Sequence, residues 1–570
     1  MDRTAWIVIA FCVIGLVAWE WWVAKHAPPR PSPVSASPTI TPPLAGPSLS
    51  PLPGPSPFPS STPAAVGSVP AFAEKVETLR NGDVELRLTN RGGAIAEAVL
   101  LNHIAEDDKR VTLNAGSHTP IGAIVEDPSA PDLPEYRIAR QSDTVTMERV
   151  TAQQLTIRKT FLFPTAEKKD NFAAQLNVDL VNGSEKPYLN RGYFLAVGSA
   201  APIHKNDYMS FTRLVWCVNG SAKGVDVSRF AGSSGFFGIL GQRPPEQFFN
   251  ESVNGAEWVA TSDQFFTTLV APLTGKSDAV WAQRFDIDPA RRIYGLEGAM
   301  HMPGFELGPG QTYSARFEIY LGPKLYHKLA TLSHNEAEVM EFGFFKIISQ
   351  ALLNALNTLH GVLGNYAAAI LALTTIVKLV LWPIQNKATK SARQMGALAP
   401  KMQELREKYK DDPTRMNQEL MKLYKEYGIN PVGGCLPMFI QIPIFFGLFT
   451  MLRQAVELRN ASFLWIHDLS QPDTVAHLPV VGWPLNILPL IMAATSFWMT
   501  HLTPKSGDPT QQRMMMFTPI IFIVFCYNFA AALALYYTTQ NLLTIVQLYH
   551  NRKQPLPTLE RVQAGKRKTR

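Results

Sequence analysis

Five apolar stretches fill most of the C-terminal part of this 570-residue chain, and they limit its fold more than any other feature. We place them at 364–382, 434–452, 484–502, 515–527 and 530–548. A helix needs roughly 20 apolar residues to cross a bilayer, and only the fourth stretch, which contains Pro519, is clearly short. A similar run at the N-terminus, within 1–27, ends among tryptophans. We interpret it as an uncleaved anchor in preference to a cleaved signal peptide. The sequence therefore predicts six membrane spans.

A linker and a large domain separate the anchor from the other spans. Residues 28–70 are rich in Pro, Ser and Ala, a composition that favours extended conformers and cannot build a core. From 71 to 325, apolar and polar residues alternate, as in Val84-Glu85-Leu86-Arg87-Leu88 before the turn residues Asn90-Arg91-Gly92-Gly93. The runs 176–181 and 317–321 repeat this alternation. We expect an all-β sandwich built from antiparallel strands.

The remaining segments read as helical. Residues 326–363 predict a linker and an amphipathic helix that lies in the membrane interface. The five-span core at 364–550 is interrupted at 385–430 by a helical hairpin, whose second helix should begin at Asp412-Pro413. Two apolar stripes run along this hairpin. Their members are Leu398, Met402, Leu405 and Tyr409, and then Met416, Leu420, Leu423 and Tyr427. The chain ends in a basic tail at 551–570.

The distribution of charge predicts the orientation in the membrane. Residues 387–425 carry ten Lys and Arg and 552–570 carry seven, whereas 457–484 has only Arg459. Cytoplasmic loops are enriched in Lys and Arg, so the hairpin and the C-terminus should be cytoplasmic. Alternation of the spans then places the β-sandwich domain outside and the N-terminus inside. Because the net charge of +7 gathers beside spans, we do not expect DNA as a partner.

Basic side chains on the hairpin have two interpretations of equal weight. The candidates for docking are Lys401, Arg406, Lys408 and Lys410. They are either a solvated face that obeys the positive-inside pattern or a docking arm for acidic partners such as ribosomes or nascent chains.

A single cation, Lys378, interrupts the apolar stretch 370–382. An ammonium at that depth costs a few kcal/mol, so it should face protein or a water-filled cavity. Thr374 lies one turn earlier on the same face. Since Trp382 and Pro383 are near, Lys378 could instead extend to the headgroups, and its position alone does not separate these alternatives.

Further polar residues favour the cavity. Gln441 lies in the third span, and the last span contains Thr538, Thr539, Gln540 and Asn541. Each is costly against lipid, and the alternative role for some of them is a hydrogen bond between helices. The spans after the anchor contain no clear Asp or Glu to pair with Lys378. An unpaired cation would therefore attract an acidic group of another molecule. Together with Lys378, these polar residues could line a water-filled groove.

Signs of catalysis or of a bound metal are missing from the sequence. It has no G-x-S-x-G, H-E-x-x-H or Walker motif. Its cysteines are scattered, without the spacing of a zinc site or a disulfide framework, and we interpret all as packing residues. They are Cys12, Cys217, Cys435 and Cys526. We expect no enzyme activity, no cofactor and no metal.

Motifs in the C-terminal part resemble the YidC membrane protein insertase family. They are Asn430-Pro431-Val432-Gly433-Gly434-Cys435-Leu436-Pro437, Gln441-Ile442-Pro443-Ile444-Phe445, Leu464-Trp465-Ile466-His467-Asp468-Leu469, and Leu535-Tyr536-Tyr537 with Asn541 and Gln547. Arg91-Gly92-Gly93 and Tyr320-Leu321-Gly322-Pro323 are weaker motifs of its Gram-negative branch, which has a periplasmic β-sandwich shaped like galactose mutarotases. A sugar-converting enzyme is the alternative from another class. An ion-coupled transporter is a third, but no internal repeat favours it.

This resemblance implies a function, partners and a location. It implies an insertase and chaperone of the bacterial inner membrane that works without ATP hydrolysis, alone or with the Sec translocon. Nascent membrane proteins, ribosomes and the lipid bilayer are the implied partners. In the family, a hydrophilic groove carries a basic residue on the second span, and Lys378 aligns with it. The resemblance thus predicts a substrate groove formed by Lys378, Thr374, Gln441, Tyr537 and Thr538. The family usually has Arg at the position of Lys378, and Lys lacks the planar fork that grips a carboxylate with two bonds.

Overall fold

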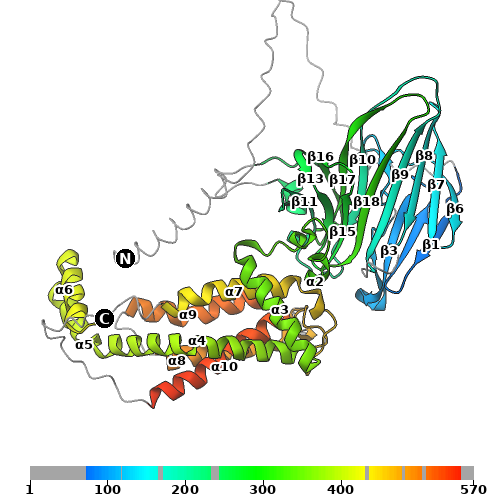
Figure 1. Ribbon diagram of the computed structural model, residues 1–570. Coiled ribbons are helices and arrows are strands. Elements are labelled where there is room, and N and C mark those ends of the chain that lie inside the picture. Colours follow the sequence, from blue (N-terminus) through cyan, green and yellow to red (C-terminus); the bar gives the residue numbers. More distant parts are fainter. Residues whose placement is uncertain are drawn as a thin grey trace, which may run out of the picture. The chain divides into compact units, whose positions relative to one another are not determined.

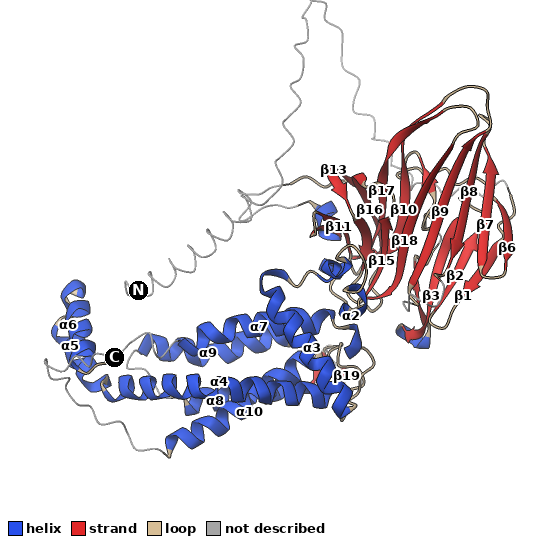
Figure 2. Cartoon of the chain, in the orientation of Figure 1, coloured by secondary structure: helices blue, strands red, loops and turns tan. Residues whose placement is uncertain are grey.

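A computed structural model of the chain describes residues 72–116, 118–164, 171–232, 243–429, 436–477, 482–503 and 509–553 (Figure 1). The predicted anchor and linker lie outside the described residues. So do most of the basic tail and the segment 430–435 of the resemblance motif. Most strands lie in the N-terminal part of the described chain and most helices in the C-terminal part. Figure 2 shows the strands in red and the helices in blue, and the colours of Figure 1 give their order in the sequence.

The N-terminal part consists of antiparallel strands. They are β1 Val76–Arg80, β2 Val84–Thr89, β3 Ala94–Ile104, β4 Arg110–Leu113, β5 Ile124–Val125, β6 Arg137–Gln141, β7 Thr144–Val150, β8 Leu155–Leu162, β9 Ala173–Asn182, β10 Tyr188–Ala200, β11 Arg213–Val218, β12 Ser221–Asp226, β13 Phe248–Ala256, β14 Trp258–Ser262, β15 Phe266–Pro272, β16 Ser277–Asp288, β17 Ile293–Leu307 and β18 Thr312–Pro323. Short 3-10 helices join some of them. These are η1 Glu106–Asp108, η2 Met209–Phe211 and η3 Val227–Ala231. The expectation of an all-β domain is confirmed.

Three sheets form from these strands. The four-stranded sheet has the order β1-β2-β3-β4, the five-stranded sheet β13-β16-β17-β10-β5, and the nine-stranded sheet β12-β11-β14-β15-β18-β9-β8-β7-β6. The two larger sheets pack closely. A Cβ added at Gly298 in β17 would stand 2.4 Å from Leu214 Cδ1 in β11, so a larger residue there would force the Leu214 side chain to move.

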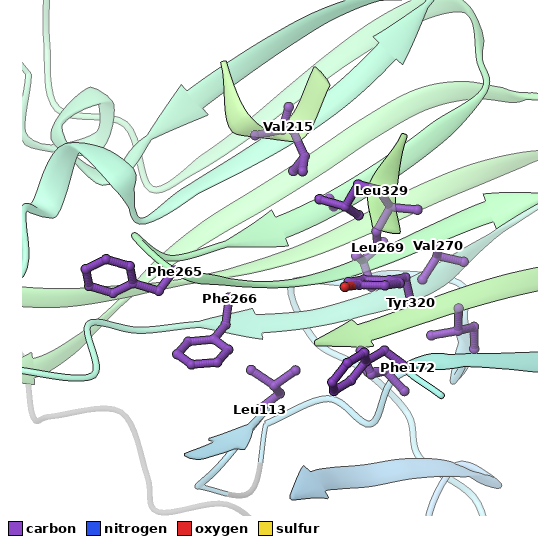
Figure 3. Close-up of a cluster of buried hydrophobic side chains, with 14 of the residues drawn as sticks. Leu113, Phe172, Val215, Phe265, Phe266, Leu269, Val270, Tyr320 and Leu329 are labelled. Carbon is purple, nitrogen blue, oxygen red and sulfur yellow. The ribbon is translucent and has the colours of Figure 1, made fainter. Parts of the chain in front are cut away.

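Alternating side chains from the strands fill the core, as the period-two pattern predicts. Residues of β2 show this directly, because Val84, Leu86 and Leu88 are fully buried. Figure 3 shows the aromatic part of the core, where Phe172, Phe266 and Tyr320 converge from different segments. Burial of such apolar surface supplies the main driving force for folding this domain.

Packing accounts for the two weaker family motifs. Gly92 and Gly93 have φ of +72° and +56°, and a Cβ at Gly93 would lie 2.5 Å from Tyr136 Cγ. In the second motif, Tyr320 donates a 2.7 Å hydrogen bond to the Pro323 carbonyl. Both motifs therefore have structural roles in this domain, since glycine readily adopts positive φ and allows close approach.

Helices make up most of the C-terminal part. They are α2 Tyr326–Leu329, α3 Lys346–Leu363, α4 Tyr366–Ala397, α5 Ala399–Lys408, α6 Pro413–Glu426, α7 Leu436–Gln454, α8 Ile487–Leu502, α9 Pro509–Cys526 and α10 Ala531–Arg552. Short elements accompany them. These are the 3-10 helices η4 Glu336–Met340, η5 Gly343–Phe345 and η7 Val456–Leu458, and the strands β19 Thr474–His477 and β20 Pro484–Asn486.

The helix boundaries differ from the expected spans at several places. The fourth stretch, expected at 515–527, belongs to α9, which begins earlier, at Pro509. The last stretch, expected to end at 548, continues in α10 to Arg552. The stretch predicted to end at 382 continues as α4 to Ala397, because Pro383 removes one backbone donor without breaking the helix. The stretch predicted to begin at 484 starts with β20, and its helix begins at Ile487. Among the described helices, Tyr366–Ala397 alone is both long and apolar enough to cross a membrane by itself, and Ile487–Leu502 is a shorter apolar helix.

The hairpin of α5 and α6 follows its sequence signals closely. Asp412 caps α6, because its Oδ1 accepts a 3.0 Å hydrogen bond from the Arg415 amide, and Pro413 occupies the first turn. The two apolar stripes meet in a small core. Its buried members are Leu398, Met402, Leu420, Leu423 and Ile429. The predicted cap is present, and the two stripes pack against each other.

Candidate functional site

Lys378 lies on α4 with its side chain inside the helical part, where only 2% of the residue is exposed. Its Nζ donates a 2.5 Å hydrogen bond to Gln385 Oε1, two turns further along the same helix. A second bond of 2.8 Å runs to Thr544 Oγ1 on α10. Among the residues that the structure describes, no carboxylate pairs with Lys378. Two neutral oxygens therefore hold this ammonium between two helices.

A cavity of about 340 Å³ opens beside this ammonium. Helix α4 contributes Lys378, Gln385, Ala388, Thr389 and Ala392. Helix α10 contributes Tyr537, Gln540, Asn541, Thr544, Gln547 and Leu548. Gln441 of α7, Met499 of α8 and the following Thr503 complete the wall. Most of these side chains are amides or hydroxyls, so the cavity offers many hydrogen-bonding groups and one positive charge.

Amide side chains connect the helices around the cavity. On α10, Asn541 donates to Ser496 Oγ of α8 at 2.8 Å and to Thr495 Oγ1 at 3.2 Å. At the other end, Asn386 Oδ1 of α4 accepts from Gln547 Nε2 at 2.8 Å and from Asn551 Nδ2 at 3.1 Å. Hydrogen bonds of this kind stabilise contacts between helices in lipid. They keep α4 and α8 in place on α10.

The structure brings together three of the five predicted groove residues. Lys378, Gln441 and Tyr537 all line the cavity. Thr374 does not, because it is buried and its hydroxyl donates to the Ile370 carbonyl of its own helix at 2.6 Å. Thr538 is also absent from the wall, and its buried hydroxyl has no partner within the described residues.

The two residues that contact Lys378 are not among the predicted groove residues. Gln385 lies beyond the predicted span, which ends at 382, but α4 continues to Ala397 and carries Gln385 on the same face as Lys378. Thr544 follows Gln540 by one turn on α10, so its face was predictable from helical periodicity. Its pairing with α4 was not.

The four predicted docking residues lie on the hairpin at different exposures. Lys401, Lys408 and Lys410 are exposed and Arg406 is half-buried. Lys401 donates to the Tyr427 hydroxyl and lies 4.6 Å from the centre of its ring. Lys401 therefore ties α5 to the end of α6, which gives it a structural contact in addition to its charge.

A second cavity, of about 390 Å³, lies in the β domain and bears on the alternative of a sugar-converting enzyme. Its two carboxylates already serve structural contacts. Asp263 Oδ1 accepts the backbone amides of Phe265 and Phe266, both at 2.7 Å, and Glu106 pairs with Lys205 at 3.4 Å. Burial raises the pKa of Asp263 to about 6. This cavity offers no pair of free carboxylates in its described wall.

The two cysteines within the described residues, Cys217 and Cys526, are both buried and both free thiols. This agrees with the interpretation of these two as packing residues. Cys12 and Cys435 lie outside the described residues.

Comparison with known families divides the chain into two matches, whose boundary falls within α3, after the last strand of the β domain. Residues 77–355 match the family model of the YidC periplasmic domain, and residues 358–556 match that of the 60Kd inner membrane protein. The helices that form the Lys378 cavity all lie within the second match.

Individual relatives and solved structures give the extent of the similarity. The membrane protein insertase YidC of Cupriavidus taiwanensis is 40% identical over 291 residues, which cover 51% of this chain and 49% of that protein. A protein of the same name from Laribacter hongkongensis is 30% identical over 582 residues. The match covers 97% of this chain and 98% of that protein. The match thus spans about half the length of several relatives but nearly all of this one.

Solved structures show low sequence identity. An active YidC insertase with its first transmembrane domain resolved is 20% identical, with a TM-score of 0.34 and coverage of 85% of this chain and 94% of that one. A galactose mutarotase related enzyme from Lactobacillus acidophilus is 10% identical, with a TM-score of 0.29 and coverage of 43% and 97%. The assignment therefore rests on the two family models and on the full-length relative. By these criteria the chain belongs to the YidC membrane protein insertase family.

Proposed function

We propose that this protein is an insertase of the bacterial inner membrane, which transfers segments of other membrane proteins from water into lipid. The observation that carries the proposal is Lys378, a buried ammonium that has no carboxylate partner in the described residues and borders a cavity lined with amides and hydroxyls. A buried cation is costly in a membrane and is usually retained for a function.

The proposed mechanism lowers the cost of moving a polar tail past lipid. A short hydrophilic tail enters the cavity, where Gln441, Gln540 and Tyr537 offer hydrogen bonds in place of water. An unsatisfied polar group in hydrocarbon costs several kcal/mol, so these bonds remove most of the barrier. The apolar segment that follows partitions into lipid beside the cavity. This process needs no ATP and no covalent step, and the protein is not an enzyme in this proposal.

Lys378 supplies the attraction for acidic tails in this mechanism. The positively charged ammonium favours any carboxylate that reaches the cavity. Its compact charge, with three rotatable donors, accepts an anion from several directions, whereas an arginine fork would fix the geometry of the pair. We infer that the protein recognises acidic tails of varied sequence through charge.

The remaining parts of the proposal concern orientation and partners. The chain has six spans with both termini in the cytoplasm, and the β domain lies in the periplasm. The hairpin, with Lys401, Arg406, Lys408 and Lys410, receives nascent chains or ribosomes on the cytoplasmic side, which the density of Lys and Arg there supports. The protein works alone or with the Sec translocon, and it also assists folding of its clients as a chaperone.

Reconstitution tests the insertase activity directly. The purified full-length protein is placed in liposomes that contain no other protein, and a small single-span test protein with an acidic tail is synthesised beside them. We expect a protease-protected fragment well above the level in protein-free liposomes. Equal protection in both would refute the proposed function.

Two substitutions at Lys378 test the site. We expect Lys378→Ala to reduce insertion of the acidic tail and Lys378→Glu to reduce it further, because a carboxylate repels the tail. Lys186→Ala, at an exposed lysine of the β domain, is the matched control and should insert at the wild-type rate. If both Lys378 variants also insert the acidic tail at the wild-type rate, Lys378 has no electrostatic role in insertion. This outcome would leave the insertase activity itself unaffected.

A further inference from the structure

The contacts of Lys378 identify a second residue that acts on the same substrate. The ammonium has three donors, and the described residues use two of them, one for Gln385 Oε1 and one for Thr544 Oγ1. The Thr544 hydroxyl donates its own proton to the Gln540 carbonyl at 2.7 Å, so it accepts the hydrogen bond from Lys378. The third donor of Lys378 remains for a molecule in the cavity.

Gln385 reaches Lys378 because of the path of α4. Seven residues separate them, which is almost two full helical turns, so both side chains lie on one face of the helix. The helix continues through Pro383, which lies between them. Gln385 lines the cavity as Lys378 does, so a tail that enters meets the amide and the ammonium together.

The neutral amide holds the ammonium in place without cancelling its charge. A hydrogen bond from an ammonium to a carboxylate is stronger than one to a neutral amide oxygen. A carboxylate on an entering tail therefore gains by displacing Gln385, whereas a neutral amide on a tail exchanges one equivalent bond for another. Displacement thus discriminates between tails by charge, and the difference between the two kinds of bond amounts to about tenfold in rate or affinity.

We propose that Gln385 is a positioning and specificity-determining residue. It holds Lys378 toward α10 in the empty cavity and releases it to a tail that carries a carboxylate. This inference rests on the proposed insertase function and adds the residue that makes the selection for acidic tails depend on displacement of a neutral amide. A carboxylate at position 385 would neutralise Lys378 permanently and remove this selection.

The experiment compares two test proteins that differ only in one tail residue, Asp or Asn. Insertion of each into proteoliposomes is measured with the wild type, and the Asp to Asn ratio of rates is the readout. We expect a ratio of about 10 for the wild type. For Gln385→Glu, an isosteric change, the ratio should fall to about 1, because the new carboxylate pairs with the Lys378 ammonium and prevents it from pairing with the tail.

Gln540→Glu is the matched control, because it adds the same charge to the same cavity at a position with no bond from its side chain to Lys378. We expect it to lower the ratio less than Gln385→Glu does. Equal falls in the two variants would show that net charge matters and position 385 does not, and this would overturn the inference.

A rescue experiment separates recognition from folding. Lys378→Gln should bring the ratio to about 1, and the exchange Lys378→Gln with Gln385→Lys should restore most of it, because the ammonium still faces the cavity from position 385. A purely structural role for Gln385 does not predict this recovery, and its absence would contradict the inference. If the wild type inserts neither test protein, the proposed function itself is refuted. Insertion of both at equal rates would refute only the selection by charge.

Discussion

Two buried lysines in this chain show how access to a cavity changes the role of the same group. Lys159 is fully buried in the β domain, where its Nζ donates to the carbonyls of Gly92 at 2.9 Å and Gly122 at 3.0 Å. Lys378 has comparable neutral partners but borders a cavity. Lys159 therefore holds the backbone at Gly92 and Gly122 against β8. Lys378, by contrast, can bind a molecule that enters the cavity.

Burial gives Lys159 a measurable effect on stability, since it lowers the pKa of this amine from 10.5 to about 7. Between pH 7 and 9 the unfolded chain holds the proton more strongly than the folded chain, so raising the pH favours folding. The free energy of unfolding of wild type, relative to Lys159→Met, should rise by about 2 kcal/mol over this range. Urea unfolding of the detergent-solubilised protein, followed by tryptophan fluorescence, measures it.

The control for this prediction is Lys186→Met, at an exposed lysine of the same domain. Its free energy of unfolding should follow that of wild type at both pH values. A constant difference between wild type and Lys159→Met from pH 7 to 9 would mean that Lys159 keeps its proton in the folded domain.

Helix α10 organises the membrane part, because α4 and α8 both bond to it through side-chain amides. The two contacts occur at different levels of the helix, Asn541 toward α8 and Gln547 with Asn551 toward α4. The cavity lies among these contacts. Its width is therefore set by polar bonds between helices and by packing, and a loss of either contact should loosen its wall.

A double-mutant cycle tests the contact between α8 and α10. We expect Asn541→Ala and Ser496→Ala to be coupled by about 0.6–1.7 kcal/mol, as found for hydrogen bonds between helices in membranes. Unfolding of the protein in mixed detergent micelles with increasing dodecyl sulfate measures each free energy.

Thr539→Val provides the comparison for this cycle, since the Thr539 hydroxyl donates to the Leu535 carbonyl of its own helix at 2.8 Å and makes no bond to α8 within the described residues. Its coupling to Ser496→Ala should be close to zero. Coupling of the same size in both cycles would assign the effect to general packing and not to the Asn541 bond.

The whole chain combines two unlike folding problems. In the β domain, apolar surface is buried away from water around one core, whereas the C-terminal helices carry exposed apolar side chains such as Val380, Val524 and Phe525. Exposed apolar surface of this kind suits contact with lipid. In our proposal, a bilayer covers these side chains and separates the β domain from the hairpin.

Labelling of single cysteines tests this orientation. In a variant without Cys12, Cys217, Cys435 and Cys526, one cysteine replaces Lys186 or Lys410. An impermeant maleimide added to intact spheroplasts should label position 186 and leave position 410 unmodified until the membrane is opened. The reverse pattern would contradict the proposed topology.

Local patterns predicted a large share of the fold. Alternation in Val84-Glu85-Leu86-Arg87-Leu88 identified a strand, and Asp412-Pro413 identified the first turn of α6, because each depends only on neighbours in the chain. The motifs of the C-terminal part identified the family for a similar reason. Periodicity and turn chemistry are local properties, so a sequence displays them directly.

The site depended on information that no local pattern holds. The sequence identifies Lys378 as a lone cation. Thr374, on the same face of the helix, donates its hydroxyl to its own backbone and does not reach the cavity. Thr544, which contacts Lys378, lies 166 residues further along the chain. The sequence alone thus specified which parts form strands and which form helices, the distribution of charge from which we predict the orientation, and the presence of a cation. The packing of α4 against α10 specified its partners and the cavity, because contacts between distant segments depend on how whole helices fit together.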